Sequence, residues 1–165
     1  ATLPNCYRTI GINRNNFLSC VQLRPYVPEQ IQAIEWISFA SNAFNAFIPF
    51  YANVNEVPEF YRTCEEKVST DSLYWTSRLI AAMADADYSQ SIPHIERYQD
   101  KIPSYGHKII NETDKEFKNT NDLSLLTIAN LKIEDFVKEQ TYALLHTILD
   151  IRSNNMLNRF SRSDG

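Results

Sequence analysis

The spacing of apolar residues changes near residue 55, and this change constrains the fold more than any other feature of the chain. Residues 7–54 contain short segments rich in Phe, Ile, Val, Tyr and Trp, which are typical of β-strands. After Glu59, apolar residues recur at steps of three and four, which is typical of amphipathic helices. We therefore predict an α+β fold in which a few antiparallel strands are followed by long helices.

A free-standing sheet needs three or more strands and a covered face, and residues 7–54 supply barely that number. We therefore expect residues 1–55 to complete a sheet of a larger domain. Residues 56–165 are expected to form a helical layer, and the two parts together to make one partial domain. Apolar residues on both strand faces predict a sheet that is covered on both sides.

Alternation, turn residues and prolines mark the strands. Asn-rich turns are expected before residue 17 and at residues 42–45. Pro25 ends one strand because it has no backbone donor, and Pro49 within the last strand predicts an edge strand or a bulge. Strands are therefore expected at residues 7–12, 17–24, 33–40 and 46–52.

Caps and breaks mark the helices. Ser69 or Thr70 is expected to cap the first of them, and Pro93 is expected to be the first residue of the second. Pro103 is expected to bend or interrupt that second helix. Helices are thus expected from the Ser69–Thr70 cap to residue 86, from Pro93 to a polar break at residues 119–122, and at residues 125–156.

Composition excludes several function classes. Three glycines leave little room for phosphate-binding loops, and a net charge of −4 without a basic stripe argues against nucleic acid. No segment approaches the roughly 20 apolar residues that cross a membrane. Three widely spaced cysteines and three scattered histidines predict no metal site and no organic cofactor. They suit unpaired thiols in a reducing cytoplasm.

No residue pattern specifies a reaction. Cys6 has no histidine nearby in the sequence to act as a base, and Cys20 is expected in the core of a strand. Arg8 and Arg14 lie at the ends of a short expected strand, where a guanidinium can bind a carboxylate through two hydrogen bonds. The alternative for both arginines is a surface cation beside an acidic helix.

The segments in order resemble a known family. The C-terminal third of the bacterial C69-type dipeptidases resembles this chain both in the order of these segments and in their amino-acid sequence. The resemblance covers nearly the whole chain, although residues 105–140 match only as generic helix. It rests on YRTIGINRN (residues 7–15), QLRPYVPE (22–29), IEWISFASNAFNAFIPFYANV (34–54), VSTDSLYWTSRLIAAMAD (68–85) and NRFSRSD (158–164).

This resemblance implies an N-terminal-nucleophile hydrolase with an αββα fold. In that family a cysteine at the mature N-terminus attacks the substrate, and its own α-amino group serves as the base. This chain begins with Ala1, so the nucleophile is expected outside it and the fragment alone is expected to be inactive. Arg8 is the candidate arginine beside the thiol. Asn42, Asn45 and Phe47 are the candidate substrate-binding residues, in an aromatic segment at residues 41–51 that is expected to border the pocket.

The partners implied are dipeptide substrates, the remainder of the same polypeptide and a possible homo-oligomer. The alternative is a non-enzymatic helical module for interaction or oligomerisation, with residues 60–157 as its working surface.

Overall fold

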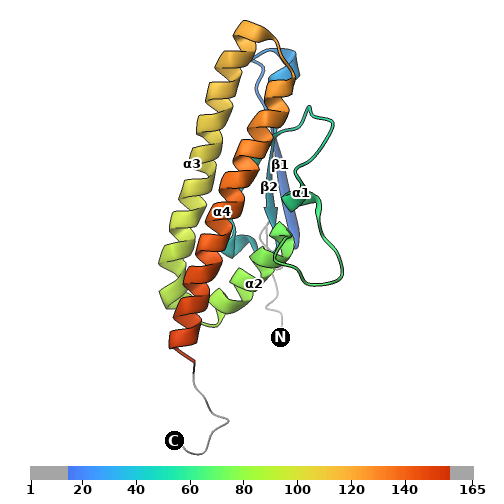
Figure 1. Ribbon diagram of the computed structural model, residues 1–165. Helices are drawn as coiled ribbons and strands as arrows, with labels where there is room; N and C mark the ends of the chain where they lie inside the picture. The colour runs from blue at the N-terminus through green and yellow to red at the C-terminus, as the bar shows by residue number, and fades with distance from the viewer. Residues whose placement is uncertain (1–14, 157–165) are drawn as a thin grey trace, which may run out of the picture.

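The computed structural model describes residues 15–156, which form three antiparallel strands followed by helices (Figure 1). The predicted α+β class and its order of strands before helices are confirmed. The strand expected at residues 7–12 lies outside the described residues. The elements are β1 (Phe17–Leu23), η1 (Glu29–Ile31), β2 (Ala33–Phe39), η2 (Asn42–Phe44), β3 (Ile48–Tyr51), α1 (Glu59–Arg62), α2 (Leu73–Asp85), α3 (Tyr88–Thr120) and α4 (Ser124–Asn154).

The sheet has the order β1-β2-β3, and both pairs are antiparallel. Phe17 lies opposite Phe39 in the first pair, and Ile34 lies opposite Tyr51 in the second. β3 is therefore an edge strand within the described residues, as Pro49 predicted.

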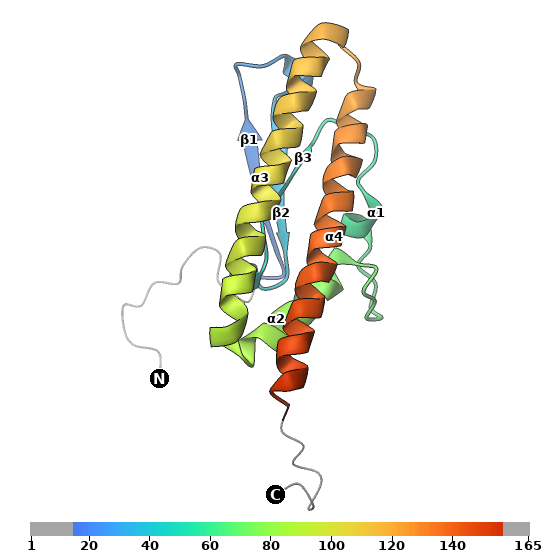
Figure 2. The same cartoon turned by 60° about the vertical axis from the view of Figure 1, so that its left-hand side comes forward.

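The two long helices lie side by side against the sheet, and α2 crosses near their lower end (Figure 2). α3 and α4 both contact β3, and α2 contacts β2. The free edge of β3 is closed by one side chain of α4. The Asn130 Oδ1 accepts a hydrogen bond from the Tyr51 backbone N–H at 2.8 Å, and the Asn130 Nδ2 donates to the Tyr51 carbonyl at 3.1 Å. The amide thus replaces the backbone of a missing neighbouring strand.

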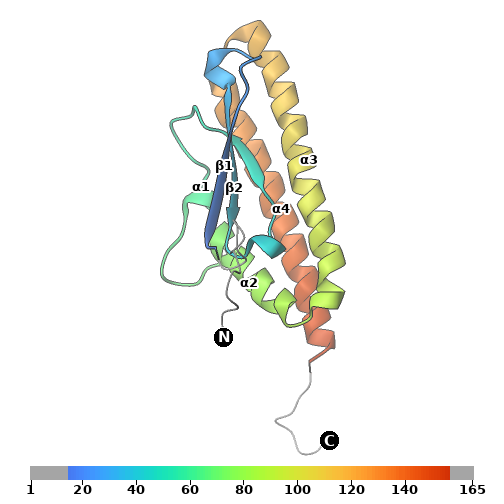
Figure 3. The ribbon, with the colours of Figure 1, turned by 180° about the vertical axis from the view of Figure 1, so that it is seen from behind.

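β1 forms the opposite edge of the sheet, and it is largely uncovered (Figure 3). Six of its seven residues are exposed, among them Phe17 (51%), Val21 (59%) and Leu23 (71%). The prediction of a sheet covered on both sides is therefore wrong for β1 within the described residues. The prediction that Cys20 lies in the core is also wrong, because its side chain is exposed. Alternation shows which residues share a strand face, but it does not show whether the covering layer belongs to the same chain.

The first residues of two helices, α2 and α3, differ from those predicted. α2 begins at Leu73, and its N-cap Ser72 donates its hydroxyl hydrogen to the Thr63 carbonyl at 2.5 Å, so neither Ser69 nor Thr70 is the cap. α3 begins at Tyr88 and continues through Pro93 and Pro103, so Pro93 is not its first residue and Pro103 does not interrupt it. Packing of its apolar stripe outweighs the local cost of the prolines. That stripe includes the buried residues Ile95, Tyr98, Ile102, Ile109, Ile110 and Phe117.

Neither long helix has the composition of a membrane span. Between residues 15 and 156, no helix combines the length and the apolar character needed to cross a bilayer.

Gly106 allows α3 to approach β3 closely. A Cβ atom built on Gly106 would lie 2.9 Å from the Pro49 Cδ and closer still to the Pro49 Cγ. Because the proline ring cannot rotate away, we expect Gly106→Ala to destabilise the protein by about 1–3 kcal/mol, despite the better helix propensity of alanine. Urea unfolding of the full-length protein measures this. In the background of Pro49→Ala the loss should largely disappear, and an equal loss in both backgrounds would show that the contact is not the cause.

Candidate functional site

The turn after β2 is held tightly in place. Ala40 has φ of 59°, in the left-handed region that costs an alanine about 1–2 kcal/mol. Its backbone N–H donates to the Asn16 carbonyl at 2.8 Å, just before β1 begins. The buried Asn45 donates its amide hydrogens to the carbonyls of Phe39 and Ser41, the latter at 3.1 Å. Strained backbone held by its surroundings is common at functional sites, which directs attention to this turn.

The predicted substrate-binding residues all belong to this turn, and Arg8 lies outside the described residues. Asn42 is half-buried at the start of η2. Asn45 uses its side-chain amide within the turn, and its carbonyl accepts a hydrogen bond from the Gln99 Nε2 at 3.1 Å. Phe47 is 41% exposed.

A cavity of about 500 Å³ lies between this turn, the residue before β1 and one side of α2. This volume is within the usual range of small-molecule pockets, roughly 300–1,000 Å³. Ser41 and Phe44 of the segment 41–51 line this cavity, whereas Asn42, Asn45 and Phe47 are not among its lining residues. The described residues that line it are Asn16, Ser41, Phe44, Arg78, Ala81, Ala82 and Asp85.

Two opposite charges on α2 line the cavity. The Arg78 Nη1 donates to the Asn16 Oδ1 at 3.1 Å, and the guanidinium lies 5.9 Å from the centre of the Tyr74 ring. Arg78 and Asp85 are seven residues apart, so they project from one side of the helix two turns apart. Within residues 15–156, neither forms an ion pair. Neither residue was predicted from the sequence, although their spacing on an amphipathic helix was a usable signal.

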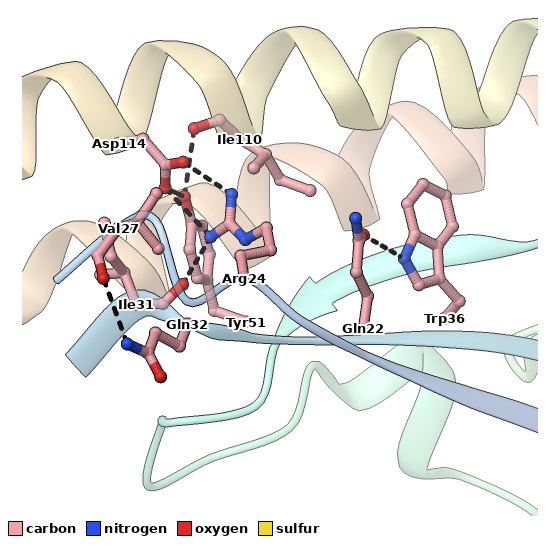
Figure 4. Close-up of polar contacts among 9 residues, drawn as sticks. All are labelled: Gln22, Arg24, Val27, Ile31, Gln32, Trp36, Tyr51, Ile110 and Asp114. Atoms are coloured by element: carbon pink, nitrogen blue, oxygen red, sulfur yellow. Dashed lines mark hydrogen bonds and ion pairs between the residues drawn. The ribbon is translucent and has the colours of Figure 1, made fainter. Parts of the chain in front are cut away.

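A second polar cluster lies between the sheet and α3 (Figure 4), and its residues Arg24, Tyr51 and Asp114 are buried. The Arg24 Nη1 lies 2.6 Å from the Asp114 Oδ2, and the Arg24 Nη2 lies 3.2 Å from the Asp114 Oδ1. The Tyr51 hydroxyl donates to the Asp114 Oδ1 at 2.7 Å. Burial, followed by the hydrogen bond to Asp114, raises the pKa of Tyr51, so the phenol remains protonated and keeps donating.

This cluster connects the strands to α3. Arg24 follows β1 and is 5% exposed, and its Nη2 also donates to the Ile31 carbonyl at 2.5 Å. The paired charges therefore fix the sheet against the helical layer. This cluster was not predicted from the sequence. The available signal was Asp114, a carboxylate within the apolar stripe of α3, between Ile110 and Phe117.

The thiols and histidines of the described residues lie apart from the cavity. Cys20 and Cys64 are both exposed and unpaired. The His107 ring lies 4.9 Å from the Trp36 ring, on the helix-facing side of the sheet. Among residues 15–156 no three His, Cys, Asp or Glu side chains are grouped as metal ligands.

Comparison with known proteins relates the chain to one family. The model of peptidase family C69 matches residues 1–101. "Probable dipeptidase A" of Streptococcus pyogenes serotype M18 is 37% identical over 158 residues, which are 96% of this chain and 33% of that protein. "Dipeptidase" of Bifidobacterium longum is 31% identical over 199 residues, covering 96% of this chain and 37% of that protein. "Dipeptidase A" of Lactobacillus helveticus is 36% identical over 147 residues, covering 87% of this chain and 31% of that protein.

The chain thus spans about a third of the length of these curated relatives. The family model covers more than half of the chain, and the similarity to the relatives extends over nearly all of it. The chain therefore belongs to peptidase family C69.

Proposed function

We propose that this chain is the C-terminal segment of a cysteine dipeptidase that hydrolyses dipeptides through an N-terminal cysteine outside the chain. The observation that carries the proposal is the similarity over 96% of the chain to proteins named dipeptidase, of which it spans about a third. The chain supplies strands and a helical layer, and the remainder of the polypeptide supplies the nucleophile.

The exposure of β1 supports the proposal that more of the polypeptide packs against this strand. Phe17, Val21 and Leu23 alternate along β1 and so share one face of the sheet. An exposed edge strand with an apolar face is an aggregation hazard unless another layer or strand covers it. In this proposal the remainder of the same polypeptide covers β1 and continues the sheet toward an αββα arrangement.

The cavity beside the turn is the proposed substrate pocket. Ser41 and Phe44 of the turn line it. Asn42, Asn45 and Phe47 belong to the same turn and are proposed to support substrate binding through it, Asn45 by fixing the turn. Arg8 precedes β1 in the sequence and is proposed to lie beside the thiol of the nucleophile. Its positive charge would then stabilise the thiolate.

The proposed reaction needs no histidine. The α-amino group of the N-terminal cysteine accepts the thiol proton, and the thiolate attacks the carbonyl carbon of the peptide bond. The C–N bond breaks as the leaving amine takes the proton, which leaves a thioester on the cysteine. Water then attacks the thioester, releases the first amino acid and restores the thiol.

Hydrolysis by the full-length protein tests this function. We expect the full-length protein to cleave unmodified dipeptides, and this chain alone to cleave none. Replacing the N-terminal cysteine by alanine should lower kcat by at least about 10³-fold, because the covalent step is lost. Release of free amino acids, followed by chromatography, measures the reaction. Dipeptide cleavage that survives this replacement would exclude the proposed mechanism. No cleavage by the unsubstituted protein would favour a helical interaction module instead.

A further inference from the structure

We propose that Arg78 and Asp85 bind the two charged ends of the dipeptide in the cavity beside η2. Arg78 would bind the α-carboxylate, and Asp85 would bind the α-ammonium group. The inference rests on the proposed dipeptidase function and names the residues that restrict it to substrates of two residues.

Both side chains line the same cavity from a single rigid element. Arg78 and Asp85 lie on α2, on the same wall as Ala81 and Ala82, which are too small to fill the space between them. Because the two charges come from one helix, their separation does not depend on loop motion.

The separation of the two charges suits a dipeptide. Seven residues of helix place the two Cα atoms about 10.5 Å apart along the axis. A dipeptide extends about 7 Å, and a charge-assisted hydrogen bond of about 2.8 Å at each end gives a total of about 13 Å. The arginine side chain covers the difference, because long helical side chains lean toward the N-terminus, away from Asp85. A tripeptide is about 3.5 Å longer and exceeds this span.

Both charges are available to a ligand in the part of the chain that the structure describes. Arg78 and Asp85 are seven residues apart, so they do not form an ion pair with each other, because ion pairs along a helix form between residues three or four positions apart. Among residues 15–156 neither pairs with another charged side chain.

Asn16 fixes the guanidinium and connects it to the turn. Its Oδ1 accepts one hydrogen bond from the Arg78 Nη1 at 3.1 Å, and its carbonyl accepts one from the Ala40 N–H at 2.8 Å. One N–H of the guanidinium is thus occupied, and the others remain to bind a carboxylate. Arg78 is therefore held in position against the strained turn that borders the same cavity.

Blocked substrates test this assignment in the full-length enzyme. The kinetic constants kcat and KM are compared for three substrates: Ala-Ala, N-acetyl-Ala-Ala and Ala-Ala amide. For Ala-Ala, we expect Arg78→Gln and Asp85→Asn each to lower kcat/KM by about 10- to 100-fold, mainly through KM. Arg78→Gln should have little effect on cleavage of the amide, because that substrate has no α-carboxylate for Arg78 to bind. Asp85→Asn should have little effect on cleavage of the N-acetyl substrate, because that substrate has no α-ammonium group for Asp85 to bind.

Arg97→Gln and Asp150→Asn serve as matched controls. Both residues lie on exposed helical positions outside the cavity, and we expect all three substrates to be cleaved at unchanged rates. Equal losses for free and blocked substrates, or no loss at all, would overturn the assignment while leaving the dipeptidase function intact. No cleavage of Ala-Ala by the unsubstituted enzyme would overturn the proposed function, and this inference with it.

Discussion

Asp114→Asn is expected to lower the free energy of unfolding by about 3–5 kcal/mol, the largest loss that we predict for a single substitution. The change leaves the guanidinium of Arg24 in a buried position without an opposite charge. Asparagine keeps one acceptor oxygen, so it can still accept the Tyr51 hydroxyl hydrogen, but its NH2 group cannot accept the second hydrogen bond from Arg24. Urea unfolding of the full-length protein, followed by the fluorescence of its tryptophans, measures the change.

Two further variants distinguish the effect of losing the ion pair from a general effect of substitutions in α3. Glu112→Gln removes an exposed carboxylate from the same helix and should change stability by less than about 0.5 kcal/mol. The double variant Arg24→Met with Asp114→Leu removes both charges and should recover much of the loss, because no unpaired charge remains. If the double variant is as unstable as the sum of the two single ones, the ion pair is not the cause.

Asn130→Leu is expected to cost about 2–4 kcal/mol, because it leaves two buried backbone groups of Tyr51 without partners. The leucine has a similar size, but it can neither accept the Tyr51 N–H nor donate to the Tyr51 carbonyl. The edge of β3 would then lack the only hydrogen bonds that join its backbone to α4 within the described residues. Hydrogen exchange at the Tyr51 amide measures the effect directly, and we expect its protection to fall with the free energy of unfolding.

Asn111→Leu is the matched control for this substitution. Asn111 lies on the exposed side of α3, so the same change of side chain should leave stability within about 0.5 kcal/mol. Unchanged protection of the Tyr51 amide in the Asn130 variant would show that water satisfies the edge of β3 equally well.

Local signals predicted the three described strands and the last helix closely. Alternation and Pro25 limited the first described strand to residues 17–24, and β1 is observed at Phe17–Leu23. The polar break at residues 119–122 is also observed. There Asn121 adopts a left-handed conformation, with φ of 53°, and ends α3. Such signals depend on a few neighbouring residues, so the sequence contains them directly.

Features that depend on distant residues were not predicted. The uninterrupted α3 needs the packing of its stripe to outweigh Pro93 and Pro103, which no local rule anticipates. Arg24 and Asp114 are 90 residues apart in the sequence, and Asn16 and Arg78 are 62 apart. The turn at residues 42–45 was expected from its asparagines, but the charged wall that α2 contributes to the cavity became evident only from the fold.

The position of the nucleophile is the central claim, and substitution of cysteines in the full-length protein tests it most directly. This chain contains three cysteines, Cys6, Cys20 and Cys64. We expect the triple variant Cys6→Ser, Cys20→Ser and Cys64→Ser to keep its rate of dipeptide hydrolysis and its inactivation by iodoacetamide. Peptide mapping should then find an alkylated cysteine at the N-terminus of the mature protein. Loss of hydrolysis in the triple variant, with its fold intact by circular dichroism, would place the nucleophile within this chain and contradict the account.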